Sequence, residues 1–198
     1  MRNFGSEPPT VVQKLLLLSN GTPSFMKNPF QRSYSAEERW VFDFLSEVKL
    51  FESLNNEEKS FFLPYLYLRE YQQDEVVFFR RDPAHALYIV KKGEVKLMLD
   101  MDQDFEKLAV VRERHSFGNN ALIRDAKRLY SAIICSSEAE LHVVPHVNIY
   151  EIFGEESQVQ AKMCASLAHL YEQHVEDLYE SYRLSQGFFS LDRLDRMI

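Results

Sequence analysis

The histidines are the residues of this chain whose spacing could support metal chemistry. His142 and His146 are four apart, but Pro145 between them indicates a strand entering a turn, which removes the helical face that two ligands would share. His169 and His174 are five apart and therefore lie on different faces of a helix. No three-ligand set follows from these positions. We expect ordinary surface or core histidines and no metal.

Nucleophilic and phosphate-binding motifs are also missing from the sequence. Cys135 and Cys164 are the only cysteines, too few for an iron–sulfur cluster or a cysteine-rich zinc site. Their separation in apolar sequence predicts buried thiols in a reducing, cytoplasmic compartment. There is no G-x-S-x-G, G-x-G-x-x-G or G-x-x-x-x-G-K-[ST] motif, and the 198 residues include only six glycines. The sequence predicts a protein that is not an enzyme and has no cofactor.

Charge and hydropathy restrict the partners. The composition, 45% hydrophobic and 27% charged, is that of a globular protein. A net charge of −7 argues against nucleic acid as the main partner, because phosphates are neutralised by clustered Lys and Arg. The apolar run 11–18 is interrupted by Lys14 and is too short to cross a bilayer. We therefore expect a cytoplasmic protein with no membrane contact.

The elements that would position side chains begin with helices over 34–65. Before them, residues 1–33 contain several prolines and predict either an extended arm or a partly disordered terminus. Ser35 and Glu38 form a capping box, and Asn55 or Asn56 caps a second, shorter helix. The apolar face expected of the first helix consists of Trp40, Val41, Phe44, Leu45 and Val48.

Residues 66–146 have a different texture, with short segments rich in β-branched and aromatic residues separated by polar turns. Such spacing predicts a sandwich, barrel or β-roll. The expected strands are 66–70, 75–80, 86–90, 94–100, 107–112, 129–135 and 139–144. A turn at Gly93 precedes the segment with the clearest alternation.

Residues 147–186 return to a helical period, first in a short helix that ends at Gly154 and then in a long helix from about 157 to 185. The long helix carries one apolar stripe, made of Leu167, Tyr171, Val175, Leu178 and Tyr182. A compact domain cannot cover so long a stripe, which predicts a homodimer; packing against residues 1–33 is the alternative. The tail 187–198 has mixed charge.

Four motifs occur in a specific order. They are L-F-E-S-L at 50–54, D-E-V-V-F at 74–78, D-P-A-H-A-L-Y-I-V-K-K-G-E-V at 82–95, and F-G-N-N-A-L at 117–122 with Arg128 six residues later. Over residues 44 to 186 the chain resembles the cyclic nucleotide-binding domain family of catabolite-activator-type regulators, kinase regulatory subunits and gated channels. The resemblance implies a mainly β fold with flanking helices: a double-stranded, jelly-roll-like β-roll followed by a long C-terminal helix.

The resemblance also implies a ligand site in the segment that corresponds to the family's phosphate-binding cassette. In the family, an arginine pairs with the cyclic phosphate and a carboxylate accepts from the ribose hydroxyl. The residues at the cassette positions here are Phe117, Gly118, Asn119, Asn120, Ala121, Leu122, Arg128, Leu129 and Ser131, with Arg128 at the phosphate position.

Several cassette positions depart from the family pattern. Asn119 replaces the ribose carboxylate, and Leu129 and Tyr130 replace small residues, so we expect the leucine to fill space beside the phosphate. Asp74 and Ala84 stand where the family prefers glycine. Arg128 would then meet an anion, pair with Asp125 or Glu113, or point to solvent.

These departures favour a non-enzymatic regulatory module that has lost or altered its binding of cAMP or cGMP. It would act through dimerisation on the long helix and through a protein partner. The alternative is a cyclic-nucleotide or small-anion sensor that moves the long helix when its pocket is filled. Residues 187–198 are too few for a helix-turn-helix, so we expect no specific DNA binding from this chain alone.

Overall fold

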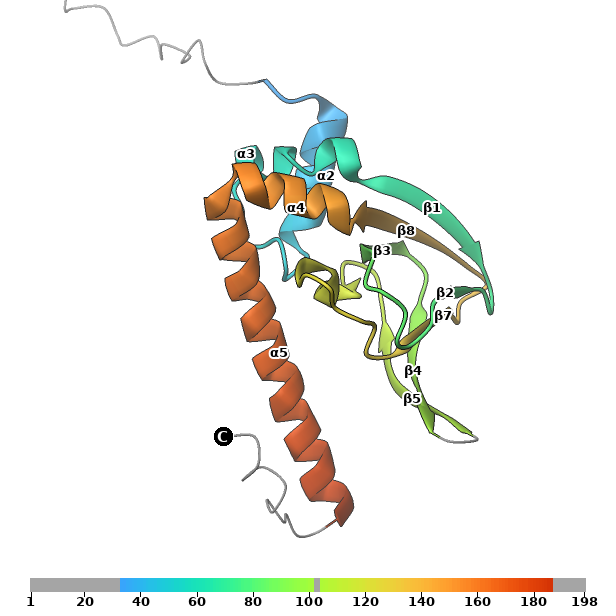
Figure 1. Ribbon diagram of the computed structural model, residues 1–198. Helices are drawn as coiled ribbons and strands as arrows, with labels where there is room; N and C mark the ends of the chain where they lie inside the picture. Colours follow the sequence, from blue (N-terminus) through green and yellow to red (C-terminus); the bar gives the residue numbers. More distant parts are fainter. Residues whose placement is uncertain (1–32, 102–103, 187–198) are drawn as a thin grey trace, which may run out of the picture. The chain divides into compact units, whose positions relative to one another are not determined.

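The chain divides into two compact units, residues 1–34 and 35–198. The computed structural model describes residues 33–101 and 104–186, so residues 1–32 of the predicted arm and the predicted tail 187–198 lie outside the described residues. All helices and strands given below belong to the second unit (Figure 1). None of the helices described is long and apolar enough to cross a membrane.

Three short helical elements open this unit: α2 (Ala36–Ser46), α3 (Asn56–Ser60) and the 3-10 helix η1 (Leu63–Tyr65). The predicted capping box is confirmed, because the Glu38 N–H donates to Ser35 Oγ at 3.1 Å and the Ser35 N–H donates to the Glu38 carboxylate at 2.7 Å. Asn55 caps α3 in the same way.

The predicted inner face of α2 is wrong at two positions. Phe42, which was not predicted, is fully buried, whereas Trp40 is 51% exposed and stacks on the ring of Phe44, with the two ring centroids 5.6 Å apart. The buried side of α2 is therefore rotated toward Phe42 and away from Trp40.

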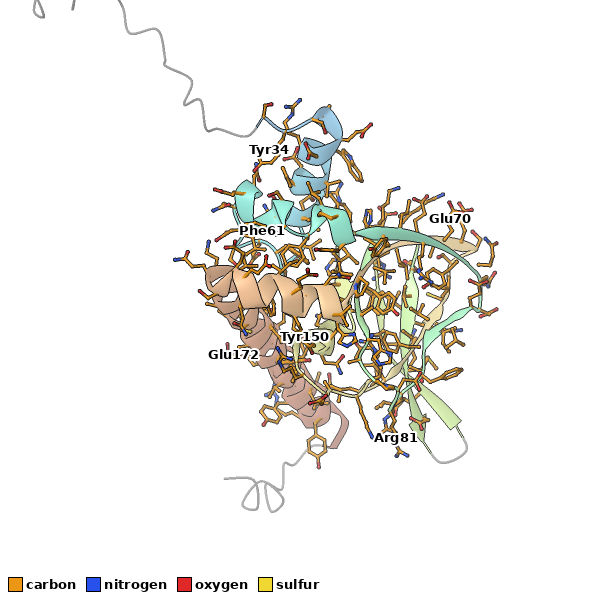
Figure 2. The ribbon with its side chains drawn as sticks, turned by 45° about the horizontal axis from the view of Figure 1, so that its top comes forward. Tyr34, Phe61, Glu70, Arg81, Tyr150 and Glu172 are labelled. Atoms are coloured by element: carbon orange, nitrogen blue, oxygen red, sulfur yellow. The ribbon has the colours of Figure 1, made fainter. Side chains whose placement is uncertain are left out.

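Eight antiparallel strands form two four-stranded sheets, ordered β1-β8-β3-β6 and β2-β7-β4-β5. The strands are β1 (Tyr67–Gln72), β2 (Val76–Phe78), β3 (Ala86–Lys92), β4 (Val95–Met101), β5 (Asp104–Val111), β6 (Ser116–Phe117), β7 (Ser131–Ile134) and β8 (Glu138–Pro145). This is the expected β-roll, and only the two-residue β6 had no counterpart in the prediction. Side chains fill the space between the sheets (Figure 2).

Two cores hold the unit together. One lies inside the β-roll, among residues such as Phe78, Phe117 and Leu141. The other joins the helices to one end of the roll, with Phe51, Phe62 and other apolar side chains at its centre. Since both cores border the cassette, its position is set by packing on two sides.

The chain ends in two helices, α4 (His146–Glu155) and the 30-residue α5 (Ser157–Gln186), which leaves the helical cluster and extends far beyond it (Figure 1). Gly154 does not cap α4 as predicted: it lies inside the helix, and Glu156 is the C-cap residue. The Glu156 N–H bonds the Ile152 carbonyl at 2.7 Å, which continues the helix past the glycine.

Some turns adopt left-handed backbone with few glycines. Gly93 has φ 90° as the predicted turn requires, and the carbonyl oxygen of Glu138 would lie 2.5 Å from a Cβ at that position. Asp74, at a position where the family prefers glycine, has φ 64°. Arg114, in the turn between β5 and β6, also has φ 64°. The backbone therefore keeps the left-handed conformation at these positions and bears the steric cost of a side chain.

Candidate functional site

The cassette runs from β6 through the 3-10 helix η2 (Asn119–Leu122) and a loop to β7. Gly118 precedes η2 with φ 66°, and a Cβ there would lie 2.5 Å from an Arg128 nitrogen. Glycine is needed at this position both for the backbone conformation and for the space that the arginine occupies.

Arg128 is the central side chain of the cassette and is only 3% exposed. Its Nη1 donates to the Gly118 carbonyl at 2.9 Å and to Asn120 Oδ1 at 3.2 Å, and its Nη2 donates to the Ala86 carbonyl at 2.6 Å. The guanidinium also lies over the Phe78 ring, 4.1 Å from its centroid. Oxygen atoms of the chain itself thus accept hydrogen bonds from both Nη1 and Nη2, the guanidinium nitrogens that would otherwise bind a phosphate.

No carboxylate pairs with Arg128 in the described part of the chain, so of the three alternatives both pairing with Asp125 or Glu113 and exposure to solvent are wrong. Its hydrogen-bond acceptors are neutral carbonyl and amide oxygens. Burial lowers the pKa of the guanidinium, while the nearby hydroxyls of Tyr88 and Tyr130 act in the opposite direction. Arginine nevertheless stays charged at any ordinary pH, so the cassette contains a buried positive charge.

Tyr130 makes a second internal contact in the cassette. Its hydroxyl oxygen accepts the Gly118 N–H at 3.0 Å, and burial raises the pKa of this phenol. The ring packs against Phe78, with the two centroids 5.9 Å apart. Sequence reasoning saw a large residue where the family has a small one, but it did not identify the hydroxyl as an internal acceptor. An aromatic cluster surrounds the guanidinium and consists of Phe78, Tyr88, Phe117 and Tyr130.

Two of the remaining polar cassette side chains make hydrogen bonds, and the oxygen atom of a third has no partner among the described residues. Ser131 Oγ accepts the Arg80 N–H at 3.0 Å, and Asn120 Nδ2 donates to the Lys127 carbonyl at 2.7 Å. Asn119 is 8% exposed and its Oδ1 has no partner among the described residues. Leu129 does not fill the site as expected. Its side chain is 60% exposed, whereas that of the preceding Arg128 is buried. Phe117, Ala121 and Leu122 are buried in the cores.

The long helix reaches the cassette through Tyr171. Burial raises the pKa of the Tyr171 hydroxyl, the Tyr130 phenol raises it further, and the Arg128 charge lowers it. The predicted interface stripe is buried before Tyr171 and exposed after it. Leu167 is 6% exposed and belongs to the chain's own core, whereas Val175, Leu178 and Tyr182 are 44%, 65% and 41% exposed.

Metal and thiol chemistry find no support in the described residues. No group of three or more His, Cys, Asp or Glu side chains among residues 33–101 and 104–186 could hold a metal ion. Both cysteines are free thiols, but the expected burial is wrong: Cys164 is exposed on α5 and Cys135 is half-buried.

Comparison with known proteins agrees with this architecture. Residues 68–156 match the family model of the cyclic nucleotide-binding domain. This matched segment has the β-roll fold of that family. It includes β1 to β8, the whole cassette and α4, and it has the β-roll that the four motifs predicted.

Solved structures with the same fold include several regulators. The N-terminal domain of a transcriptional regulator from Streptomyces coelicolor A3(2) is 20% identical with a TM-score of 0.59, over 69% of this chain and 95% of that one. Thermus thermophilus catabolite activator protein is 27% identical with a TM-score of 0.57, over 68% and 64%. The regulatory domain of Toxoplasma gondii PKA, solved with cAMP, is 20% identical with a TM-score of 0.55, over 61% and 46%. The alignments thus span less than two thirds of the latter two proteins.

Proposed function

We propose that this domain is a non-enzymatic regulatory module whose cassette is occupied by its own side chains, so that cAMP and cGMP binding is lost. The observation that carries the proposal is a set of three internal hydrogen bonds at the cassette. Arg128 donates to the Gly118 and Ala86 carbonyls, and Tyr130 accepts the Gly118 N–H. A guanidinium and backbone N–H groups are the donors suited to a cyclic phosphate, and here the guanidinium and the Gly118 N–H are already in use.

Loss of the ribose contact supports the same proposal. Asn119 offers a neutral amide where a carboxylate would accept strongly from a hydroxyl. Ser131, the remaining hydroxyl of the cassette, accepts a backbone N–H. A nucleotide would have to break several internal bonds before it gained its own, and an exchange of hydrogen bonds yields little net free energy.

The module would act through dimerisation and through a protein partner, in the cytoplasm. The exposed Val175, Leu178 and Tyr182 recur at helical spacing on the second half of α5, which favours association of two long helices. The two free thiols are compatible with a reducing compartment and support the proposed cytoplasmic location.

Calorimetry with cAMP and cGMP tests the proposal. We expect no saturable heat at micromolar protein for the wild type. The variant Asn119→Glu/Leu129→Ala/Tyr130→Ala restores the carboxylate and the small residues and should gain binding. A Tyr67→Ala variant, altered on the exposed face of β1, is the matched control and should stay silent. Saturable binding by the wild type would overturn the proposal and leave the sensor as the function of this site.

A further inference from the structure

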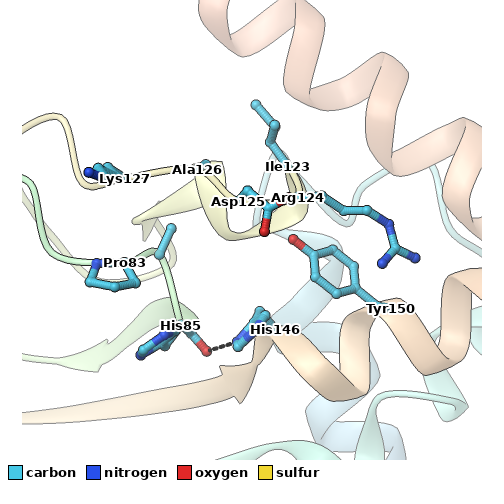
Figure 3. Close-up of a pocket in the computed structure, with 10 residues that line it drawn as sticks. Pro83, His85, Ile123, Arg124, Asp125, Ala126, Lys127, His146 and Tyr150 are labelled. Atoms are coloured by element: carbon cyan, nitrogen blue, oxygen red, sulfur yellow. Dashed lines mark hydrogen bonds between the residues drawn. The ribbon is translucent and has the colours of Figure 1, made fainter.

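A second cluster of cationic side chains lies beside the cassette, around a cavity of about 430 Å³ that Arg128 does not line (Figure 3). Three segments form its walls: the turn before β3, the cassette loop 123–127, and the first turns of α4. Nothing in the cyclic-nucleotide site requires this cavity. Its volume falls in the range of small-molecule sites.

Two cations and one acid line the cavity. They are Arg124, Lys127 and Asp125, and the imidazoles of His85 and His146 lie beside them. Within the described residues, the Lys127 ammonium makes no hydrogen bond or ion pair, and the Arg124 guanidinium makes only a cation–π contact. Two cations that are not engaged in ion pairs favour an anionic ligand.

The walls of the cavity are fixed relative to one another. The backbone N–H and the Nδ1 of His146 both bond the His85 carbonyl, each at 2.8 Å, so Nδ1 must carry a proton. The two imidazole rings stack with centroids 5.2 Å apart. On the opposite wall, the Ala84 N–H donates to the Ala126 carbonyl at 2.9 Å. Such preorganisation reduces the free energy that a ligand would spend on ordering the site.

Aromatic and apolar groups complete the lining. Arg124 lies over the Tyr150 ring, 4.7 Å from its centroid, which holds the guanidinium at the rim of the cavity. Figure 3 shows the Tyr150 hydroxyl turned toward Asp125, with Ile123 and Pro83 on other sides. The cavity therefore offers cations for a charged group and apolar surface for an organic body.

We propose that this cavity binds a small phosphorylated metabolite, whose anionic groups contact Arg124 on one side of the cavity and Lys127 on the other (Figure 3). A guanidinium offers a planar fork for phosphate oxygens, and a lysine adds a compact charge. The site is separate from the cassette interior. Since its walls come from both the cassette loop and α4, an occupant would bridge the β-roll and the helix that precedes α5.

Amide chemical shifts measured by NMR during titration with inorganic pyrophosphate test the site. We expect saturable shifts centred on residues 123–127 and 146–150. Arg124→Gln/Lys127→Gln should weaken binding about tenfold or more, because both charge-assisted contacts are lost. The control Lys107→Gln/Arg112→Gln removes the same charge from exposed residues outside the cavity and should change the affinity less than about twofold.

Three results would overturn the proposal: no saturation by about 10 mM pyrophosphate, equal weakening in the two double variants, or shifts centred on Gly118 and Tyr130. The last result would place the anion inside the cassette. It would therefore contradict the proposed function as well, whereas the first two would leave that function untouched.

Discussion

At the residue scale, the Arg128 guanidinium donates its hydrogen bonds to oxygen atoms of the chain itself, where in the family it would donate to a ligand. Three acceptors, two of them backbone carbonyls, surround a guanidinium that is 3% exposed. A buried charge is expensive unless its donors are satisfied, and here Nε is the one donor atom of the guanidinium without a partner among the described residues. Arg128 is therefore a structural residue in this state of the domain.

Replacing this arginine should cost stability. In Arg128→Met, the carbonyls of Gly118 and Ala86 lose their donors, and we expect the free energy of unfolding to fall by about 2–4 kcal/mol. Chemical denaturation of the wild type and the variant measures the difference. Arg69→Met, on the exposed face of β1, is the control and should change stability by less than about 0.5 kcal/mol. A variant at position 128 that is as stable as the wild type would show that the internal bonds contribute little.

At the element scale, β8 is the strand whose surroundings matter most, because it pairs with both β1 and β3. Its His142 lies opposite Leu68 on one side and Ile89 on the other. The ring is 7% exposed, contacts Phe44 edge-on, and has no hydrogen-bond partner for either nitrogen within the described chain. Burial, aided by the Lys91 charge and opposed by Glu140, lowers the pKa of His142 to about 4.

This histidine should make the fold sensitive to acid. Between about pH 6.5 and about pH 4 the unfolded chain binds a proton at His142 and the folded chain does not, so stability falls as the pH is lowered through this window. The loss should approach about 3 kcal/mol. Denaturation at a series of pH values should give a flatter profile for His142→Leu, whereas His174→Gln, on the exposed surface of α5, should follow the wild type. Parallel profiles for wild type and His142→Leu would contradict this assignment.

The elements were largely predictable, because each follows from a local pattern. Capping residues predicted the starts of α2 and α3, and segments rich in β-branched and aromatic residues between polar turns predicted seven of the eight strands. The two-residue β6 has no period to detect. Gly154 suggested a helix end, but α4 continues to Glu155, and the Glu156 N–H still bonds the Ile152 carbonyl.

The candidate site was less predictable than the fold. Sequence reasoning searched for acids that could neutralise Arg128, whereas the actual acceptors include backbone carbonyls, which every residue has and no motif reveals. The bond between Tyr130 and Gly118 depends on how two distant points of the loop meet in space. Leu129 was expected to fill the pocket because it stands next to Arg128, where the family has a small residue. In the structure one of the two neighbours faces inward and the other outward.

At the scale of the whole molecule, α5 joins two different environments. Its first half is anchored, with Met163 in the core and Lys162 paired with Glu58 at 2.7 Å. Its second half presents Val175, Leu178 and Tyr182 to solvent. An exposed apolar stripe on a helix this long is typical of an interface.

Light scattering with size exclusion tests the dimer. The wild type should have twice the 23.3 kDa mass of one chain, and Leu178→Glu should have the mass of one, because a carboxylate would be buried between two helices. Leu184→Glu is the matched control: this leucine is 77% exposed but lies on the opposite side of α5, so its substitution should leave the dimer intact. A monomeric wild type would refute the proposed interface.

The bond from Gly118 to Tyr130 has a consequence for what the molecule can report. The tyrosine is tethered twelve residues away, so its local concentration at the glycine is on the order of millimolar or higher, and no dilution removes it. Under the proposed function, a cassette that is filled by the chain's own Tyr130 and Arg128 does not respond to the concentration of cyclic nucleotide in the cell. Association of two chains, in contrast, follows mass action. Such a module would therefore respond to the concentration of its own chain, through the fraction that is dimeric.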